Sequence, residues 1–302
     1  MTLSEHPAVL RLLRESHTGH TGVRPLAVFD CDGTVIKGDI GESVFFRQIE
    51  EFFFRISPAE LWTDYPERAH LDVLYRTLSA TTPSARRTHP LFIDFAEHLL
   101  SWYYDQLAAD AVHKGCADIV RLFAGFTVAE VQAFSRDTLQ RELQVPLGEK
   151  TLGRRKVHSG ARFLTEAQEL IRLLLKNGFD IWAVSGSSKW SVEPVFTAFG
   201  IPEAQVIGIS LAHTNGTLSD IPIEPIPIRA EKIGALQALE RRIPLLVASD
   251  SRNDIPLLLY STTTRVWINS RRRSATDFFA AVGAPPDDRW VIIDEPTILH
   301  IN

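Results

Sequence analysis

Two aspartates stand one residue apart in the segment Asp30-Cys31-Asp32-Gly33-Thr34, directly after an apolar run. The run, Leu26–Phe29, predicts a short buried strand, and Gly33 predicts a tight turn after it. Because side chains alternate along a strand, Asp30 and Asp32 would share one face at its carboxyl end. Two carboxylates about 4 Å apart repel by roughly 4 kcal/mol at an effective dielectric near 20. Such a pair is tolerated when a cation lies between the two or when one holds a proton, and both arrangements suggest chemistry.

A second apolar run ends in a serine and a glycine, Ser185-Gly186. The amphipathic pattern of residues 163–176 predicts a helix that Asn177-Gly178 ends, and residues 179–184 then predict a strand. A hydroxyl beside the backbone N–H groups at the start of the next helix can bind an anion. The alternative is that Ser185 is simply the N-cap of that helix.

A single lysine, Lys232, comes near the start of a predicted helix that follows the proline-rich residues 222–227. The helix macrodipole disfavours a cation at this end, so Lys232 is better explained if an anion lies beside it. A solvated surface charge is the alternative interpretation.

Acids follow a further apolar run, residues 245–248, in the segment Ser249-Asp250-Ser251-Arg252-Asn253-Asp254. The run predicts a buried strand, and residues 255–261 predict a helix. Asp250 and Asp254 therefore stand four residues apart at a strand-to-helix junction.

The four segments, in this order, resemble the four motifs of the haloacid dehalogenase superfamily. The Asp-x-x-Asn-Asp pattern of residues 250–254 resembles its phosphoserine phosphatase branch. That branch has glycine before the first acid of the last motif, where this chain has Ser249, and the difference bears on the metal geometry. The resemblance implies an α/β fold with a doubly wound parallel sheet, which is a Rossmann-like core, and an inserted helical cap.

The organisation of the chain predicts two domains. Its 302 residues exceed what one hydrophobic core usually organises. About 140 residues separate the first two motifs, whereas a βαβ unit needs only about 30. Helical periodicity dominates this excess, with amphipathic helices predicted at residues 42–56, 66–78, 90–111 and 128–143. We predict an all-helical cap at residues 41–158, inserted after the first strand of a core formed by residues 1–40 and 159–302. Residues 206–213 and 217–220 predict a β-hairpin in that core.

The resemblance implies a phosphatase. In such an enzyme Asp30 would attack phosphorus to form an aspartyl-phosphate, and Asp32 would act as general acid and then general base. Asp30, the backbone carbonyl of Asp32 and Asp250 would bind Mg²⁺, and Asp254 would hold a metal-bound water. The phosphate contacts implied are Thr34, Ser185, Gly186, Lys232 and Asn253.

The leaving alcohol is less well defined. In phosphoserine phosphatases a carboxylate shortly after the first motif contacts the substrate amine, and Asp39 falls at the matching distance, with Glu42 one helical turn on. This favours a small amine-bearing phosphomonoester. The alternative is that Asp39 caps a helix that begins near residue 40. Aromatic residues of the predicted cap could hold a quaternary ammonium or form the cap's own core. Serine, ethanolamine, choline, histidinol and a sugar all remain open as leaving alcohols.

Composition narrows the remaining possibilities. A net charge of −5 gives no reason to expect a nucleic-acid partner. Two cysteines far apart in sequence indicate a reducing compartment, and without an apolar stretch of about 18 residues or a signal-peptide pattern we expect a cytoplasmic protein with no membrane partner. A phosphotransferase and a non-catalytic phosphate-binding protein are the alternative functions. The oligomeric state is not predicted.

Overall fold

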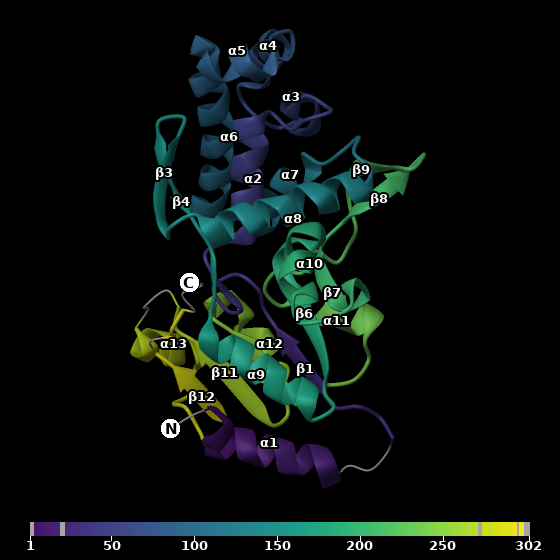
Figure 1. The fold of residues 1–302 in the computed structure, drawn as a ribbon, viewed down its shortest axis with the longest axis vertical. Helices are drawn as coiled ribbons and strands as arrows, with labels where there is room; N and C mark the ends of the chain where they lie inside the picture. The colour runs from purple at the N-terminus through teal and green to yellow at the C-terminus, as the bar shows by residue number, and fades with distance from the viewer. Residues whose placement is uncertain (1–2, 19–21, 271–273, 295, 299–302) are drawn as a thin grey trace.

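A six-stranded parallel sheet forms the lower half of the computed structural model, which describes residues 3–18, 22–270, 274–294 and 296–298 (Figure 1). The strand order is β12-β11-β10-β1-β6-β7. In chain order the strands are β1 (Leu26–Phe29), β6 (Asp180–Ser188), β7 (Val206–Ile209), β10 (Leu246–Ser249), β11 (Thr264–Ile268) and β12 (Trp290–Ile293). All neighbouring pairs run parallel. The predicted parallel sheet is therefore confirmed.

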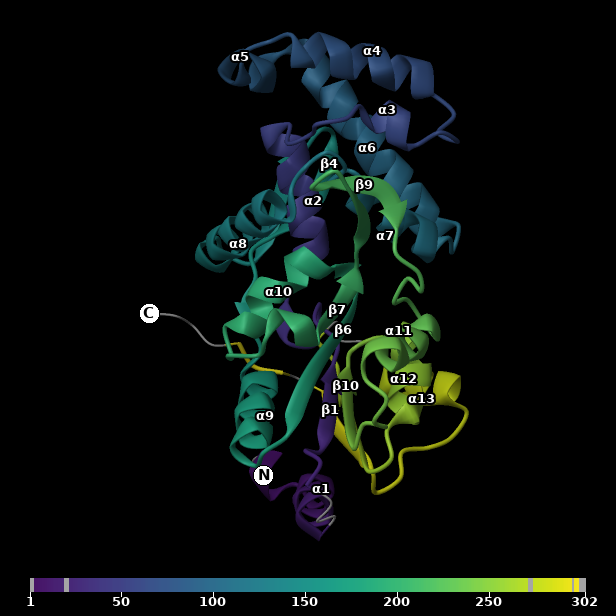
Figure 2. The ribbon, with the colours of Figure 1, turned by 90° about the vertical axis from the view of Figure 1, so that its right-hand side faces the viewer.

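Helices cover both faces of this sheet, as in a doubly wound fold. Figure 2 shows the sheet between α9 (Thr165–Lys176) on one side and α11 (Glu231–Leu239), α12 (Ile255–Tyr260) and α13 (Ala275–Val282) on the other. Apolar side chains of β1 point alternately to the two faces of the sheet, so helices are needed on both. Ala27 and Phe29 belong to the apolar cluster on the α9 side, and Leu26 and Val28 belong to the cluster on the other side.

β1 lies at the centre of the sheet, between β10 and β6. In the register, Phe29 is opposite Ala248 of β10 and Ala183 of β6. The carboxyl ends of the three strands therefore come out at one edge, the place where ligands bind in open α/β sheets.

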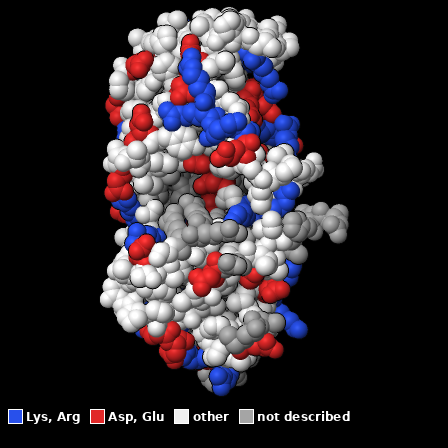
Figure 3. All heavy atoms as spheres, turned by 90° about the vertical axis from the view of Figure 1, so that its left-hand side faces the viewer, with Lys and Arg blue, Asp and Glu red and all other residues white. Residues whose placement is uncertain are grey.

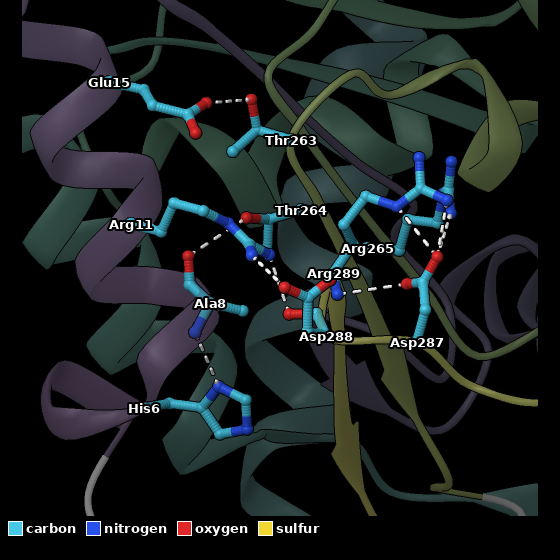
Figure 4. Close-up of polar contacts among 10 residues, drawn as sticks. All are labelled: His6, Ala8, Arg11, Glu15, Thr263, Thr264, Arg265, Asp287, Asp288 and Arg289. Atoms are coloured by element: carbon cyan, nitrogen blue, oxygen red, sulfur yellow. Dashed lines mark hydrogen bonds and ion pairs between the residues drawn. The ribbon is translucent and has the colours of Figure 1, made fainter.

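The N-terminal helix α1 (Pro7–Thr18), which follows a short 3₁₀ turn at Leu3–Glu5, closes the opposite edge. Figure 4 shows its contacts with the chain around the amino ends of β11 and β12. Arg11 pairs with Asp288 at 2.5 Å, and the Glu15 carboxylate accepts a hydrogen bond from Thr263 at 2.9 Å. This helix fixes the sheet without approaching the edge where β1, β6 and β10 end.

The segment between β1 and α9 forms the upper half of Figure 1 and is mostly helical, as expected. Its helices are α2 (Ile40–Glu51), α3 (Pro58–Leu61), α4 (Arg68–Ser79), α5 (Pro83–Thr88), α6 (Pro90–Ala108), α7 (Val112–Arg121) and α8 (Val128–Gln144). It also contains an antiparallel hairpin, β3 (Gly148–Leu152) and β4 (Arg155–Ser159), so it is not entirely helical. Most residues of this hairpin are at least partly exposed, which explains why no apolar alternation marked it in the sequence.

The chain enters and leaves this upper half, which we call the cap, through paired strands. β2 (Ile36–Lys37) and β5 (Arg162–Phe163) run antiparallel, with Ile36 opposite Phe163. The two ends of the cap are therefore held together beside the end of β1. The cap boundaries predicted from the sequence, 41 and 158, remain a prediction.

A second hairpin reaches from the core to the cap. The predicted hairpin strand 206–213 is divided: β7 joins the main sheet, and β8 (Leu211–Thr214) pairs with β9 (Thr217–Pro222). The backbone of Leu218 on β9 exchanges two 2.8 Å hydrogen bonds with Gly125 and Phe126, between α7 and α8 of the cap. Core and cap are thus joined by main-chain bonds as well as by the connecting strands.

Two further elements follow the strands that end near the cap. Helix α10 (Lys189–Thr197) continues from β6, and a 3₁₀ turn at Arg252–Asp254 follows β10. A further 3₁₀ turn, Glu203–Gln205, precedes β7. Among the helices in the described part of the chain, none has both the length and the apolar character to cross a membrane.

Candidate active site

A cavity of about 330 Å³ lies where β1, β6 and β10 end beneath the cap. All but one of the residues predicted for the site line it: Asp30, Asp32, Asp39, Ser185, Gly186, Lys232, Asp250, Asn253 and Asp254. Seen from the side of the β3–β4 hairpin, the surface is hollowed at mid-height, with Asp and Glu atoms inside and Lys and Arg side chains above (Figure 3). The chain thus brings residues from distant segments to one place.

Lys232 connects two of the predicted acids. Its Nζ lies 2.9 Å from Oδ1 of Asp30 and 2.7 Å from Oδ2 of Asp254. Burial alone would lower the pKa of this lysine, but the charges of Asp254 and Asp30 outweigh burial and raise it. Lys232 is therefore a buried cation facing anions, as its position at a helix start suggested, and not a solvated surface charge.

Asp30 follows β1 directly, and its backbone N–H donates to the Ala248 carbonyl of β10 at 2.9 Å. This bond continues the parallel ladder and fixes the direction of the residue. Burial raises the pKa of Asp30 to about 7, although the charge of Lys232 opposes the rise. The lysine therefore favours the ionised carboxylate that a nucleophile needs.

The side chain of Ser249, at the position where the phosphoserine phosphatase motif has glycine, has a hydrogen-bond partner in the site. Its hydroxyl donates to Oδ2 of Asp254 at 2.6 Å and accepts the Ser251 N–H at 3.1 Å. The residue was noted in the sequence only as a departure from the motif. Its contact with Asp254 depends on the turn at residues 252–254, which the sequence did not define.

Asp32 has different partners from Asp30. Its Oδ1 accepts the Ile40 N–H at 2.6 Å, and its Oδ2 accepts the Ser187 hydroxyl at 2.7 Å. Burial, followed by the charge of Asp39, raises the pKa of Asp32 well above its ordinary value, and these hydrogen bonds oppose the rise only in part. A carboxyl group that holds its proton is suited to act as a general acid. Ser187 was not predicted as a site residue.

The turn after Asp32 allows Asp250 to approach. Gly33 has a φ of +77°, and a side-chain carbon there would overlap the Asp250 carboxylate. Only glycine combines this conformation with such a close contact. The structure differs from expectation at Thr34, which does not line the cavity: it is fully buried, and its N–H donates to the Cys31 carbonyl at 3.1 Å. The Thr34 N–H therefore serves the turn, although the sequence predicted that Thr34 would bind phosphate.

Ser185 and Gly186 lie in the wall of the cavity, near the end of β6. The Ser185 hydroxyl accepts the Ser187 N–H at 3.1 Å. The strand continues to Ser188, which occupies the N-cap position of α10, so Ser185 is not the helix cap. Asn253 is exposed, and its N–H donates to the Ser251 hydroxyl at 3.2 Å.

Asp39 and Glu42 reach the cavity from the start of α2. The alternative reading of Asp39 is confirmed: it is the N-cap of α2, and its carboxylate accepts the Glu42 N–H at 2.9 Å. Glu42 in turn lies 3.1 Å from Nδ1 of His158. Burial lowers the pKa of His158, but the bond to Glu42 and the charge of Asp39 outweigh it and raise the pKa to about 9.

The aromatic residues of the cap serve mainly as its core. Phe53 stacks between Phe126 and Phe134 at centroid distances of 4.1 and 4.0 Å. Phe45, Tyr103 and Phe123 are exceptions, since all three line the cavity, and the ring centroids of Phe45 and Tyr103 are 5.4 Å apart. The cavity therefore has a polar wall from the core and a largely apolar wall from the cap.

The donor groups of the site fit a hard divalent cation. Six carboxylates and two basic side chains line the cavity: Asp30, Asp32, Asp39, Glu42, Asp250 and Asp254 against Arg229 and Lys232. This excess of negative charge would repel a phosphate ester unless a cation neutralised it. Mg²⁺ needs only one or two protein carboxylates and keeps water as its other ligands, and Asp30 and Asp250 can provide them. Asp254 faces Lys232 and Ser249, and within the described residues no group of three or more His, Cys, Asp or Glu is arranged around one point.

A sequence model of the haloacid dehalogenase-like hydrolases matches residues 94–259. The structure is similar to that of a conserved protein of unknown function from Anaerococcus prevotii DSM 20548, with a TM-score of 0.69 and 16% identity over 94% of this chain and 90% of that one. For a protein of unknown function from Bordetella pertussis Tohama I the TM-score is 0.55 at 17% identity, over 90% and 99% of the two chains.

A substrate-bound phosphoserine phosphatase has a TM-score of 0.46 and 11% identity, over 90% of this chain and 94% of that one. Comparison with the curated proteins gives no match. The two higher structural scores support the α/β fold, and the match to the family model covers the second, third and fourth of the sequence motifs.

Proposed function

This chain belongs to the haloacid dehalogenase-like hydrolase family, and we propose that it is a Mg²⁺-dependent phosphatase of a small phosphorylated metabolite. One observation carries the proposal: Lys232 holds Asp30 and Asp254 together in the cavity where Asp32 is held by Ser187. The arrangement places a carboxylate paired with a buried cation and a second carboxyl group, whose pKa burial raises, in one cavity.

The proposed reaction has two steps. Asp30 attacks phosphorus; a bond forms between its carboxylate oxygen and phosphorus, and the bond from phosphorus to the alcohol oxygen breaks. Asp32 gives its proton to the leaving alkoxide. Water then attacks the aspartyl-phosphate, Asp32 takes the water proton, and inorganic phosphate leaves with the Asp30 carboxylate restored.

The remaining groups stabilise negative charge on the phosphoryl oxygens. Lys232 supplies a fixed positive charge beside Asp30, and Ser185 and Gly186 line the same cavity. When bound by Asp30 and Asp250, Mg²⁺ would neutralise the acids and polarise the phosphoryl group. Gly33 leaves the room that Asp250 needs for this.

Two finer assignments belong to the proposal. Asp39 and Glu42 in the cavity wall support a substrate that carries an ammonium group, although each acid already has a protein partner. The free thiols of Cys31 and Cys116 support a reducing compartment, the cytoplasm.

Release of inorganic phosphate from an aryl phosphate, with Mg²⁺ and without an acceptor alcohol, tests the function. We expect turnover by the wild-type protein and a loss of at least a thousandfold in Asp30→Asn. Asp277→Asn, the same change on the exposed first turn of α13, should retain activity. Equal turnover by Asp30→Asn and the wild type would overturn the proposal, and so would no turnover by the wild type across a broad panel of phosphomonoesters.

A further inference from the structure

Three residues that line the cavity each carry a buried polar atom that lacks a hydrogen-bond partner within the described part of the chain: Nε2 of Gln48 and the hydroxyl oxygens of Ser188 and Ser191. Each of the three residues is at most 3% exposed. Leaving a buried donor or acceptor unsatisfied costs about 1–3 kcal/mol. Three such atoms around one cavity call for an explanation, and a ligand that satisfies them provides it.

The three residues extend the cavity away from the catalytic acids. The Ile40 N–H bonds Asp32 at the start of α2, and Gln48 lies eight residues further on, about 12 Å along the helix axis. Ser188 precedes α10, and Ser191 lies in its first turn. Helices α2 and α10 contact each other, and a side-chain carbon at Gly41 of α2 would overlap Ser187 near the end of β6. One wall therefore runs from Asp32 and Ser187 to Gln48 and Ser191.

The chemistry of these groups selects a neutral oxygen. The Gln48 amide nitrogen only donates, and a serine hydroxyl both donates and accepts, so together they suit a hydroxyl or carbonyl oxygen. The nearby cations have other partners: Arg47 bonds Glu51, and Arg229 pairs with Asp110. A carboxylate or a second phosphate would thus be buried without a free counter-charge, which is unfavourable.

We propose that Gln48, Ser188 and Ser191 form a second polar subsite that binds a hydroxyl or carbonyl oxygen of the leaving alcohol. The inference rests on the proposed phosphatase function and names its substrate class: monoesters of polyhydroxy or carbonyl-bearing alcohols, such as sugars, amino sugars, polyols and nucleosides, of which the amino sugars also carry the ammonium group that Asp39 and Glu42 support. Ethanolamine and choline have no oxygen beyond the ester oxygen to occupy the subsite. Phe45 and Phe123 line the same cavity and give it apolar surface.

The test compares two ester classes in four variants. Phenyl phosphate lacks a further oxygen, and a panel of sugar, polyol and nucleoside monophosphates carries one or more. The measured quantity is kcat/KM for the best panel ester divided by kcat/KM for phenyl phosphate. We expect this ratio to fall at least tenfold in Gln48→Leu and in Ser191→Ala, through KM.

Two matched controls lie outside the cavity. Gln168 on α9 and Ser135 on α8 also carry buried polar atoms that have no hydrogen-bond partner among the described residues, but neither lines the cavity. Gln168→Leu and Ser135→Ala should leave the ratio unchanged. A second readout is stability: removing an unsatisfied amide should keep or raise the Tm of ligand-free Gln48→Leu.

The outcomes separate the two claims. An unchanged ratio in Gln48→Leu and Ser191→Ala, with the wild type active on phenyl phosphate, overturns the subsite and leaves the phosphatase intact. The subsite is also overturned if the best wild-type substrate has no oxygen beyond its ester. A wild type that hydrolyses neither class removes the phosphatase and the subsite together. Should Gln48→Leu fail to fold, Ser191→Ala decides.

Discussion

The hydroxyl of Ser249 donates a 2.6 Å hydrogen bond to Oδ2 of Asp254, the oxygen that Lys232 also contacts at 2.7 Å. The last residue of β10 thereby holds an acid that lies five residues further along the chain. Asp254 in turn helps to fix the lysine that faces Asp30. A chain of three contacts thus connects the end of β10 to the proposed nucleophile.

Replacing Ser249 by Ala should disturb this chain of contacts. A hydrogen bond to a charged group contributes about 1.5–3 kcal/mol, so we expect kcat to fall by roughly tenfold to a hundredfold. Steady-state kinetics on an aryl phosphate measures the change. The control is Ser261→Ala, since Ser261 is also buried but its hydroxyl donates to the Leu258 carbonyl. Equal kcat values in the two variants would show that the Ser249 hydroxyl does not position the site.

Replacing Lys232 by Met should lower both stability and activity. Removing one partner of a buried ion pair leaves uncompensated charge and costs about 3–5 kcal/mol. Urea unfolding at neutral pH measures the loss of stability. Lys232→Arg retains the charge and should recover part of that stability, but less of the activity, since guanidinium geometry differs from that of an ammonium. A Met variant as stable as the wild type would contradict the buried, charged state of Lys232.

Mg²⁺ should stabilise the folded protein as well as support turnover. A ligand that binds only the folded state at a hundred times its Kd adds about 2.7 kcal/mol. We expect a chelator to abolish activity, Mg²⁺ to restore it, and Mg²⁺ to raise the Tm of the wild type. Asp250→Asn should lose the Tm response, whereas Asp277→Asn should keep it. A Tm response that survives in Asp250→Asn would place the ion elsewhere.

The stability contributed by His158 should depend on pH. Its folded-state pKa, about 9, lies above the ordinary value of 6.5, because bonds to Glu42 and Asp39 outweigh burial. The contribution is therefore complete below pH 6.5 and is lost as the pH rises through 9. A shift of this size corresponds to about 3 kcal/mol at most.

Urea unfolding of the wild type and His158→Gln between pH 6 and pH 10 checks this expectation. The difference in unfolding free energy should be largest at pH 6 and should shrink towards pH 10. His213→Gln, at an exposed position on β8, is the control and should show a small difference at every pH. A large difference for His158→Gln that does not vary with pH would contradict the charged state.

The sequence predicted the parts of the site that strand ends determine. Asp30, Ser185 and Asp250 each follow or end an apolar run, and parallel strands bring such ends to one edge. Lys232 was predicted to lie in the site because a cation at a helix start is unfavourable unless an anion lies beside it. These inferences need only local sequence patterns and the rule that parallel strands end at one edge of a sheet, so they can be made from a single sequence.

The partners of these residues could not be predicted in the same way. Ser187 and Asp32 form a hydrogen bond although they lie 155 positions apart in the sequence. Gln48 lines the cavity because α2 packs against α10. Thr34 was misplaced because the turn uses its N–H internally. The β3–β4 hairpin was missed because its partly exposed strands need little apolar alternation. Tertiary contacts and partial exposure leave no periodic signal in a sequence.

Trapping the covalent intermediate tests the central claim most directly. The wild-type protein is mixed with an aryl ester of ³²P-labelled phosphate and quenched in acid within milliseconds, and the labelled peptide is then identified. We predict label on the peptide that contains Asp30, and none in Asp30→Asn. Phosphate released with no labelled protein at any quench time, or label on a different residue, would contradict the proposed role of Asp30.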